Sequence, residues 1–219
     1  MFSENKLAGE EIIRRLIKEL GIYLERFGGG PGIADVRAGL AKWGNGPLQT
    51  ITPNDHPVCV HMDQALEAVR SNGEPTLAAA IQNIRPHLNW TVYNLYNREE
   101  IGADFADGHA FTTLIGEGGF VSAEDFDLGL FLIKPNTLYK DHHHAAPELY
   151  APLTGPHGWR FNPHDNFEWR KAHTPIWNPP WQPHTTLTGE IPFLCIFCWT
   201  RDVNIPAKVI RVKSPFKGL

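Results

Sequence analysis

The first part of the chain alternates apolar and charged positions with the period of an α-helix. Residues 10–27 place apolar side chains three and four positions apart, with charged residues between them, and GGGPG at 28–32 ends the pattern. The same period recurs in three later segments, at residues 34–43, 61–71 and 75–88. The pattern therefore predicts four amphipathic helices, the last of which ends near Pro86.

From about residue 88 the period shortens to two, which is the period of a β-strand. Gly, Pro and Asn separate short apolar segments at residues 88–96, 109–117, 125–135, 148–155, 158–161, 174–180, 184–189, 192–201 and 207–213. Many short strands joined by such turns favour an antiparallel sandwich or a small barrel. We expect a mainly helical region at residues 1–100 to pack against a β-domain at 101–219, so that both form one compact unit.

Composition and charge narrow the partners. With 42% apolar residues, the 219-residue chain can form one sizeable core, and its net charge of −4 without any Lys/Arg block argues against nucleic acid. No apolar stretch reaches the about 18 residues of a membrane span, and residues 1–15 lack the basic, then apolar, then small order of a secretory signal. We therefore expect a cytoplasmic protein with a small-molecule partner and no membrane; the oligomeric state stays open, with a homodimer among the alternatives.

Three consecutive histidines at 142–144 form the most distinctive polar cluster. On one strand His142 and His144 would point to the same face and His143 to the other, and Glu148 keeps their parity if the strand continues. Two imidazoles and a carboxylate suit one divalent transition metal ion, such as zinc, iron, manganese, nickel or cobalt. The missing ligand should come from a distant strand, and His184 is the candidate.

The spacing of these residues resembles the two cupin motifs, G-x5-H-x-H-x3-4-E-x6-G and G-x5-P-x-G-x2-H-x3-N. The matching positions are His142, His144, Glu148, Gly155, Pro179 and His184. The other motif positions, three glycines and one asparagine, are occupied by Asn136, His173, Trp181 and Thr188. The resemblance implies a cupin fold, a small antiparallel β-barrel or jelly roll, whose metal ligands are His142, His144, Glu148 and His184.

A narrower resemblance depends on Tyr150, two residues after Glu148. The pattern H-x-H-x3-E-x-Y, with Tyr139 upstream and Trp199 downstream, is similar to the cupin-type dimethylsulfoniopropionate (DMSP) lyases, over about the last half of the chain. The resemblance implies a carbon–sulfur lyase that splits DMSP into dimethyl sulfide and acrylate by β-elimination. The substrate carboxylate would bind the metal, Tyr150 would act as general base, and Tyr139 would serve in catalysis and substrate binding.

The aromatic residues of the second part suit a sulfonium substrate, because a dimethylsulfonium is a fixed cation without an N–H to donate. Aromatic faces attract such a cation. We expect Trp199 and Trp181 to bind substrate together with Tyr139, although tryptophans more often fill cores.

Several alternatives stay open from the sequence. Another cupin enzyme, a dioxygenase or isomerase acting on a small carboxylate, would use the same ligands, and so would a non-catalytic protein that binds a small ligand. Tyr150 could be a core tyrosine with a satisfied hydroxyl. Cys195 and Cys198 form a C-x-x-C pair within an apolar strand pattern, so we expect buried thiols there rather than half of a zinc site.

Overall fold

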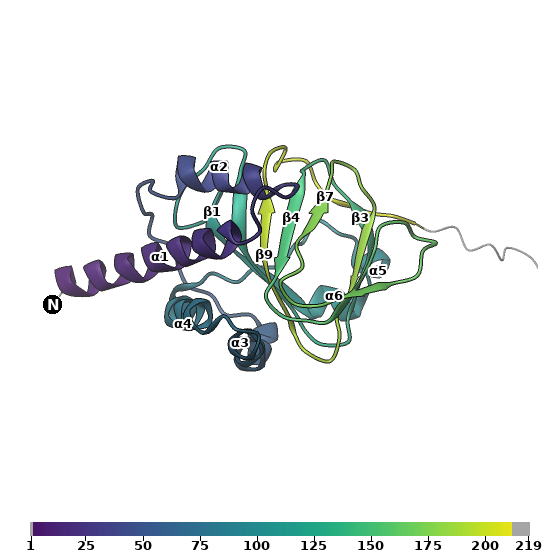
Figure 1. Cartoon of the computed structure of the whole chain (residues 1–219), viewed down its shortest axis with the longest axis horizontal. Coiled ribbons are helices and arrows are strands. Elements are labelled where there is room, and N and C mark those ends of the chain that lie inside the picture. Colours follow the sequence, from purple (N-terminus) through teal and green to yellow (C-terminus); the bar gives the residue numbers. More distant parts are fainter. Residues whose placement is uncertain (1, 212–219) are drawn as a thin grey trace, which may run out of the picture.

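The β-strands form two antiparallel sheets of five strands each in the computed structural model, which describes residues 2–211 and side chains from residue 9 onward (Figure 1). The first sheet has the strand order β1 (His109–Ile115), β2 (Asp127–Ile133), β9 (Phe193–Trp199), β4 (Glu148–Pro152) and β7 (Ile176–Asn178). The second has the order β10 (Lys208–Val209), β3 (Leu138–His143), β8 (His184–Leu187), β5 (His157–Arg160) and β6 (Glu168–Arg170). The two sheets form the cupin fold that the motif spacing predicts.

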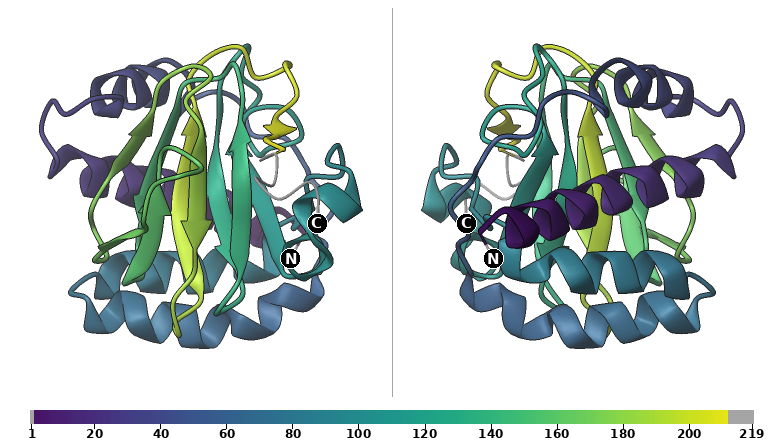
Figure 2. Two further views of the ribbon diagram at one scale, coloured as in Figure 1. Left: turned by 90° about the vertical axis from the view of Figure 1, so that its right-hand side faces the viewer. Right: turned by 90° about the vertical axis from the view of Figure 1, so that its left-hand side faces the viewer.

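Helices cover the outer face of the first sheet (Figure 2). They are α1 (Phe2–Glu25), α2 (Ile33–Trp43), α3 (Met62–Ser71) and α4 (Pro75–Ile84), with 3₁₀ turns at Pro57–His61 and Arg85–His87. Two short helices, α5 (Arg98–Ile101) and α6 (Ala103–Asp107), lie on the side of β3, and α6 contacts that strand (Figure 1). No helix in the described part of the chain has the apolar length that a bilayer crossing requires.

The central strands of the first sheet are buried on both faces. Along β2, Leu128, Leu130 and Leu132 belong to the core under the helices, while Phe131 and Ile133 belong to the core between the sheets. Strand β9 alternates in the same way between the two cores. Because apolar side chains are needed on both faces, these strands have continuous apolar sequences instead of an apolar–polar alternation.

The same alternation separates the two cysteines of the C-x-x-C pair. Cys195 lies in the core between the sheets, and Cys198 lies in the core under the helices. Both thiols are free and fully buried, and burial raises the pKa of each well above its usual range. Two thiols on opposite faces of a sheet cannot share a metal ion, which agrees with the reading of this pair as core residues.

The prediction of four helices is confirmed, but the strand predicted at residues 88–96 is wrong. That segment forms single β-bridges at Asn89 and Thr91, because Leu88 and Trp90 already bury their side chains without a full ladder. At the other end, the strand predicted at 207–213 is the two-residue β10, and residues 212 and 213 lie outside the described part.

A largely buried ion pair joins two strands of the second sheet across a third strand that lies between them. The guanidinium of Arg160, at the end of β5, donates from Nε to Oδ1 of Asp141 on β3 at 3.1 Å, and its Nη2 donates to the other carboxylate oxygen. Strand β8 lies between them. Asp141 is 5% exposed, and the Arg160 side chain is 19% exposed and stacks on the ring of Phe167. The pair therefore ties the strand of His142 to the far side of β8.

We predict that Arg160→Leu lowers the free energy of unfolding by about 3 kcal/mol, because it leaves a buried carboxylate without its partner. Urea denaturation followed by tryptophan fluorescence, on protein treated with a chelator, measures this change. Arg70→Leu removes an exposed ion pair with Glu67 on α3 and should change stability by less than about 0.5 kcal/mol. Equal effects of the two substitutions would contradict a structural role for the buried pair.

Candidate metal centre and active site

Neighbouring strands of the second sheet bring three histidines together. His142 on β3 lies directly opposite His184 on β8, and His144 follows the end of β3. One ring nitrogen of each histidine lies within 4.8 Å of those of the other two, and all three side chains are buried. His143 between them is partly exposed, as strand parity predicts, and its ring lies 5.4 Å from that of the exposed Trp181.

Backbone carbonyls determine which nitrogen of each ring faces the centre. A carbonyl can only accept, so the Nδ1–H groups of His142, His144 and His184 donate to carbonyl oxygens two residues away, at 2.8, 2.7 and 2.9 Å. When a ring is neutral, its Nε2 then carries a lone pair that can bind a metal ion. Within the described residues, Nε2 of His142 and Nε2 of His184 are buried without a hydrogen-bond partner.

Glu148 completes the group from the first sheet. Its Oε2 lies 3.2 Å from Nε2 of His144 and 3.4 Å from Nε2 of His184. The same oxygen accepts a hydrogen bond from the amide of Asn178 at 3.3 Å, and Oε1 accepts one from the Trp199 indole at 2.7 Å. The carboxylate is thus held in place by donors on the strands at either side of β4.

Electrostatics make this group a cation site. Burial alone would raise the pKa of Glu148, but the positive charge and the N–H donors that the His144 and His184 rings offer in their protonated form outweigh it and hold the pKa well below its usual range. Burial also lowers the pKa of His142, assisted by the two neighbouring rings. The ring nitrogens and the carboxylate therefore share positive charge, either as protons on the rings or as a metal ion in their place. Three imidazoles and one carboxylate fit a divalent transition metal ion.

Glu148 reaches this position by a different route from the one that strand parity predicts. Strand β3 ends at His143, and the chain bends at residues 145 and 146 before Glu148 begins β4 in the other sheet. The carboxylate therefore faces the histidines across the interior instead of along one strand. Parity does apply further on, because Tyr150 lies two residues after Glu148 on β4 and faces the same interior.

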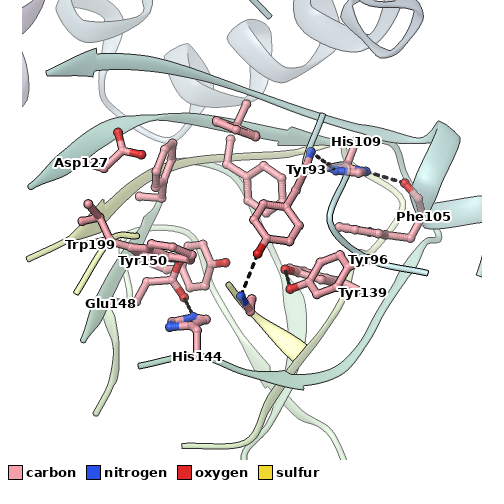
Figure 3. Close-up of a pocket in the computed structure, with 15 residues that line it drawn as sticks. Tyr93, Tyr96, Phe105, His109, Asp127, Tyr139, His144, Glu148, Tyr150 and Trp199 are labelled. Carbon is pink, nitrogen blue, oxygen red and sulfur yellow. Dashed lines mark hydrogen bonds and ion pairs between the residues drawn. The ribbon is translucent and has the colours of Figure 1, made fainter. Parts of the chain in front are cut away.

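A cavity of about 170 Å³ adjoins the candidate metal ligands. Glu148 and His144 lie at one end, and aromatic residues, among them Tyr150 and Trp199, form most of the wall (Figure 3). The Trp199 ring packs against His144 with ring centroids 4.6 Å apart. Tyr139 also lines this cavity, so three of the four predicted catalytic and substrate-binding residues meet in it.

A stack of four rings supports the site from one side. His109, Phe105, Tyr139 and His142 follow one another with centroid distances of 4.0, 4.0 and 3.8 Å and nearly parallel planes. The Tyr139 hydroxyl lies 2.8 Å from that of Tyr96. Sequence reasoning missed Tyr96, Phe105 and His109, which come from or border the segment between the helices and the sheets, where no periodic pattern marks them.

The cavity tyrosines are protonated as long as no cation is near them. Burial raises the pKa of Tyr150 well above its usual range, and the negative charge of Glu148 raises it further. Burial likewise raises the pKa of Tyr139 and of Tyr96. Any of these phenols can become a base only where positive charge offsets both effects.

Trp181 is the predicted substrate-binding residue that the structure does not bring to the cavity. Its side chain is 46% exposed, beside His143 in the loop before β8. The loop directs the ring outward because Trp181 has a left-handed backbone, with φ of 62°. Its backbone N–H instead donates to the carbonyl oxygen of His144 at 2.8 Å, so this residue supports a candidate metal ligand through its main chain.

Comparison with known proteins identifies the family. The family model for dimethylsulfoniopropionate lyase matches residues 40–195. The chain belongs to the DMSP lyase family. As a member of that family it is a carbon–sulfur lyase, and the resemblance stated from the H-x-H-x3-E-x-Y pattern is confirmed.

Two relatives illustrate how this DMSP lyase family member compares in sequence. It is 28% identical over 174 residues to DddL of Cereibacter sphaeroides, assigned as a DMSP lyase, a match that covers 76% of this chain and 69% of DddL. It is 29% identical over 109 residues to the DMSP lyase DddQ of Ruegeria pomeroyi, which covers 50% of this chain and 54% of DddQ. The second match thus spans about half of DddQ.

Solved structures of DMSP lyases share the fold of this family member. A chain from the crystal structures of RdDddP and RnDddQII superposes with a TM-score of 0.70 at 19% identity, covering 93% of this chain and all of the other. The Ruegeria pomeroyi DddQ structure gives 0.68 at 21% identity, covering 90% and 95% of the two chains. The likeness includes the helical region as well as the sheets.

The geometry of this DMSP lyase family member predicts how metal binding responds to substitution. His184→Ala should weaken binding of Zn²⁺ by at least about a hundredfold, because it removes a candidate metal ligand. Even substitution of a residue that only hydrogen-bonds to a ligand can lower metal affinity by up to about a hundredfold. Calorimetric titration of demetallated protein measures the affinity. His143→Ala is the matched control, since His143 faces away from the site, and should change the affinity by less than about threefold. If both variants bind Zn²⁺ like the wild type, the three-histidine site is wrong.

Proposed function

We propose that the protein is a metal-dependent DMSP lyase that cleaves DMSP into dimethyl sulfide and acrylate by β-elimination. The observation that carries the proposal is the aromatic cavity with a cation site at one end, where Glu148 and His144 meet the space that a small zwitterion needs. His142, His144, Glu148 and His184 would hold one divalent transition metal ion. The activity given in the names of DddL and DddQ supports this substrate.

The two ends of DMSP differ in what they need from the protein. When bound, a divalent ion would stabilise negative charge on the substrate carboxylate and favour the phenolate form of a nearby tyrosine. The sulfonium end needs aromatic faces, and Trp199 and Tyr139 supply them on the cavity wall. Trp199 is well suited because its indole N–H is already bonded to Glu148, which fixes the orientation of the ring.

Tyr150 is the proposed general base. Its phenolate would take the proton from the carbon next to the carboxylate, and the electron pair of that C–H bond would form the new double bond. The carbon–sulfur bond breaks at the same time and sulfur keeps its electron pair, so that neutral dimethyl sulfide leaves, acrylate remains and the proton stays on Tyr150. Tyr150 supports this role through its place two residues after Glu148 on β4, inside the cavity.

Tyr139 would contact the substrate and keep it in line with Tyr150. Its ring lies flat on the His142 ring, 3.8 Å between centroids, and its hydroxyl pairs with that of Tyr96. This fixed orientation suits a residue that binds and aligns the reacting carbon, because small errors of alignment cost large factors in rate.

Metal-loaded protein incubated with DMSP should release dimethyl sulfide into the headspace, measured by gas chromatography. We predict activity with at least one ion of a panel of zinc, iron, manganese, nickel and cobalt, added to demetallated protein. His144→Ala is the control, because it removes a candidate ligand whose ring is buried in the site. No dimethyl sulfide above this control with any of the metals would contradict the proposed function.

Tyr150→Phe should lower kcat for DMSP by about 10²–10⁴-fold, because it removes the base and leaves the ring. The KM and the metal content should change little. Tyr139→Phe is the matched variant in the same cavity and should lower kcat less, because the hydroxyl that it removes pairs with Tyr96. Steady-state kinetics with metal analysis of each variant decides between the tyrosines; a larger loss in Tyr139→Phe would assign the base to that residue.

A further inference from the structure

A carboxyl group with no assigned role lies in the same cavity as the candidate metal ligands. Asp127 is the first residue of β2, and it lines the cavity beside Trp199 (Figure 3). Strand register explains this, because Asp127 lies opposite Trp199 on β9 and Trp199 lies opposite Glu148 on β4. Residues directly opposite on adjacent strands point to the same face, so the three side chains form one row into the cavity.

Asp127 is partly exposed, and among the described residues its side chain has a neutral partner, the Thr113 side chain, instead of a cationic one. Its Oδ1 is buried without a hydrogen-bond partner, and no cationic side chain among residues 9–211 forms an ion pair with it. Burial raises the pKa of Asp127 to about 7, the nearby Thr113 side chain lowers it, and the charge of Glu117 raises it. A carboxylate oxygen that is buried without a partner is costly for the fold, and this one belongs to a side chain that lines the cavity in which a ligand would lie.

The dimensions match the proposed substrate. Two strand spacings, about 10 Å, separate the backbones of Glu148 and Asp127. In DMSP three bonds, about 4 Å, separate the carboxylate carbon from the sulfur. A substrate with its carboxylate at the Glu148 end therefore brings its sulfonium over Trp199 and toward Asp127.

We infer that Asp127 provides the negative charge that recognises the sulfonium end of the substrate and so determines specificity. Trp199 lies between Asp127 and the candidate metal ligand Glu148. The inference rests on the proposed function. It adds a charged contact to the aromatic faces and so distinguishes a cation from an uncharged group of the same shape, which aromatic packing alone does poorly.

The reaction itself specifies how this contact affects the kinetics. Sulfur is positively charged in bound DMSP and neutral in dimethyl sulfide, so the attraction to Asp127 is greatest before the carbon–sulfur bond breaks. An interaction that weakens toward the transition state contributes to substrate binding and not to the chemical step. The same loss of attraction favours release of the neutral product.

Asp127→Asn should raise KM for DMSP about tenfold and leave kcat unchanged or higher, since the amide keeps the shape of the side chain and removes its charge. Inhibition by 4-methylpentanoate, which has an uncharged CH where DMSP has its sulfonium, should change by less than about threefold in this variant. Glu117→Gln, which alters an exposed carboxyl near Asp127, is the control and should keep the wild-type KM.

The outcomes separate this inference from the proposed function. An unchanged KM in an active Asp127→Asn enzyme would overturn the inference alone. Equal weakening of DMSP and 4-methylpentanoate would also overturn it, because a structural defect affects both ligands. Absence of dimethyl sulfide from the wild type with every metal would overturn the proposed function and the inference together.

Discussion

Three imidazole lone pairs and a carboxylate face one another inside this protein, and the rest of the structure keeps them there. Unless a metal ion or a ring proton lies between them, these acceptors repel, so the fold must hold them at a cost. It does so with three carbonyl contacts to Nδ1 atoms, two donors on Glu148, and the ion pair of Arg160 and Asp141 behind β3. A preorganised site of this kind loses little ordering entropy when a cation binds.

The double burial of the first sheet explains why a helical layer accompanies the barrel. Strands β2, β9 and β4 direct mostly aromatic and polar residues into the interior, and direct their leucines to the other face. That outer apolar face needs a cover, which α1 to α4 provide (Figure 2). Tyr23 of α1 also donates to Nδ1 of His173, 2.8 Å away, which ties the helices to a turn that precedes the strand of Asn178.

Residues that follow a local period were predictable together with their geometry, whereas residues that converge across the sheets could be named only as candidates. The four helices and the pair His142 and His144 came from periodicity alone. Glu148 was proposed from a parity that the chain does not keep, and His184 as a distant candidate that the cupin spacing supports, because one comes from the other sheet and the other faces His142 across a strand pair. Asp127 had no sequence signal, since its place in the site follows from a register of three strands that only the fold defines.

Three positions that are glycine in the cupin motifs hold other residues in this chain, and these residues keep the backbone conformation that favours glycine. Asn136, His173 and Trp181 occupy three glycine positions of the cupin pattern, and all three have positive φ, at 54, 62 and 62°. A left-handed backbone costs a residue with a Cβ about 1 kcal/mol or more. A backbone hydrogen bond offsets this cost at each position. The N–H groups of these three residues donate, in the same order, to the carbonyl oxygens of Gly189, Pro152 and His144. The turns are therefore determined by the contacts that they make, and a search that requires glycine at these positions would miss a site whose backbone is intact.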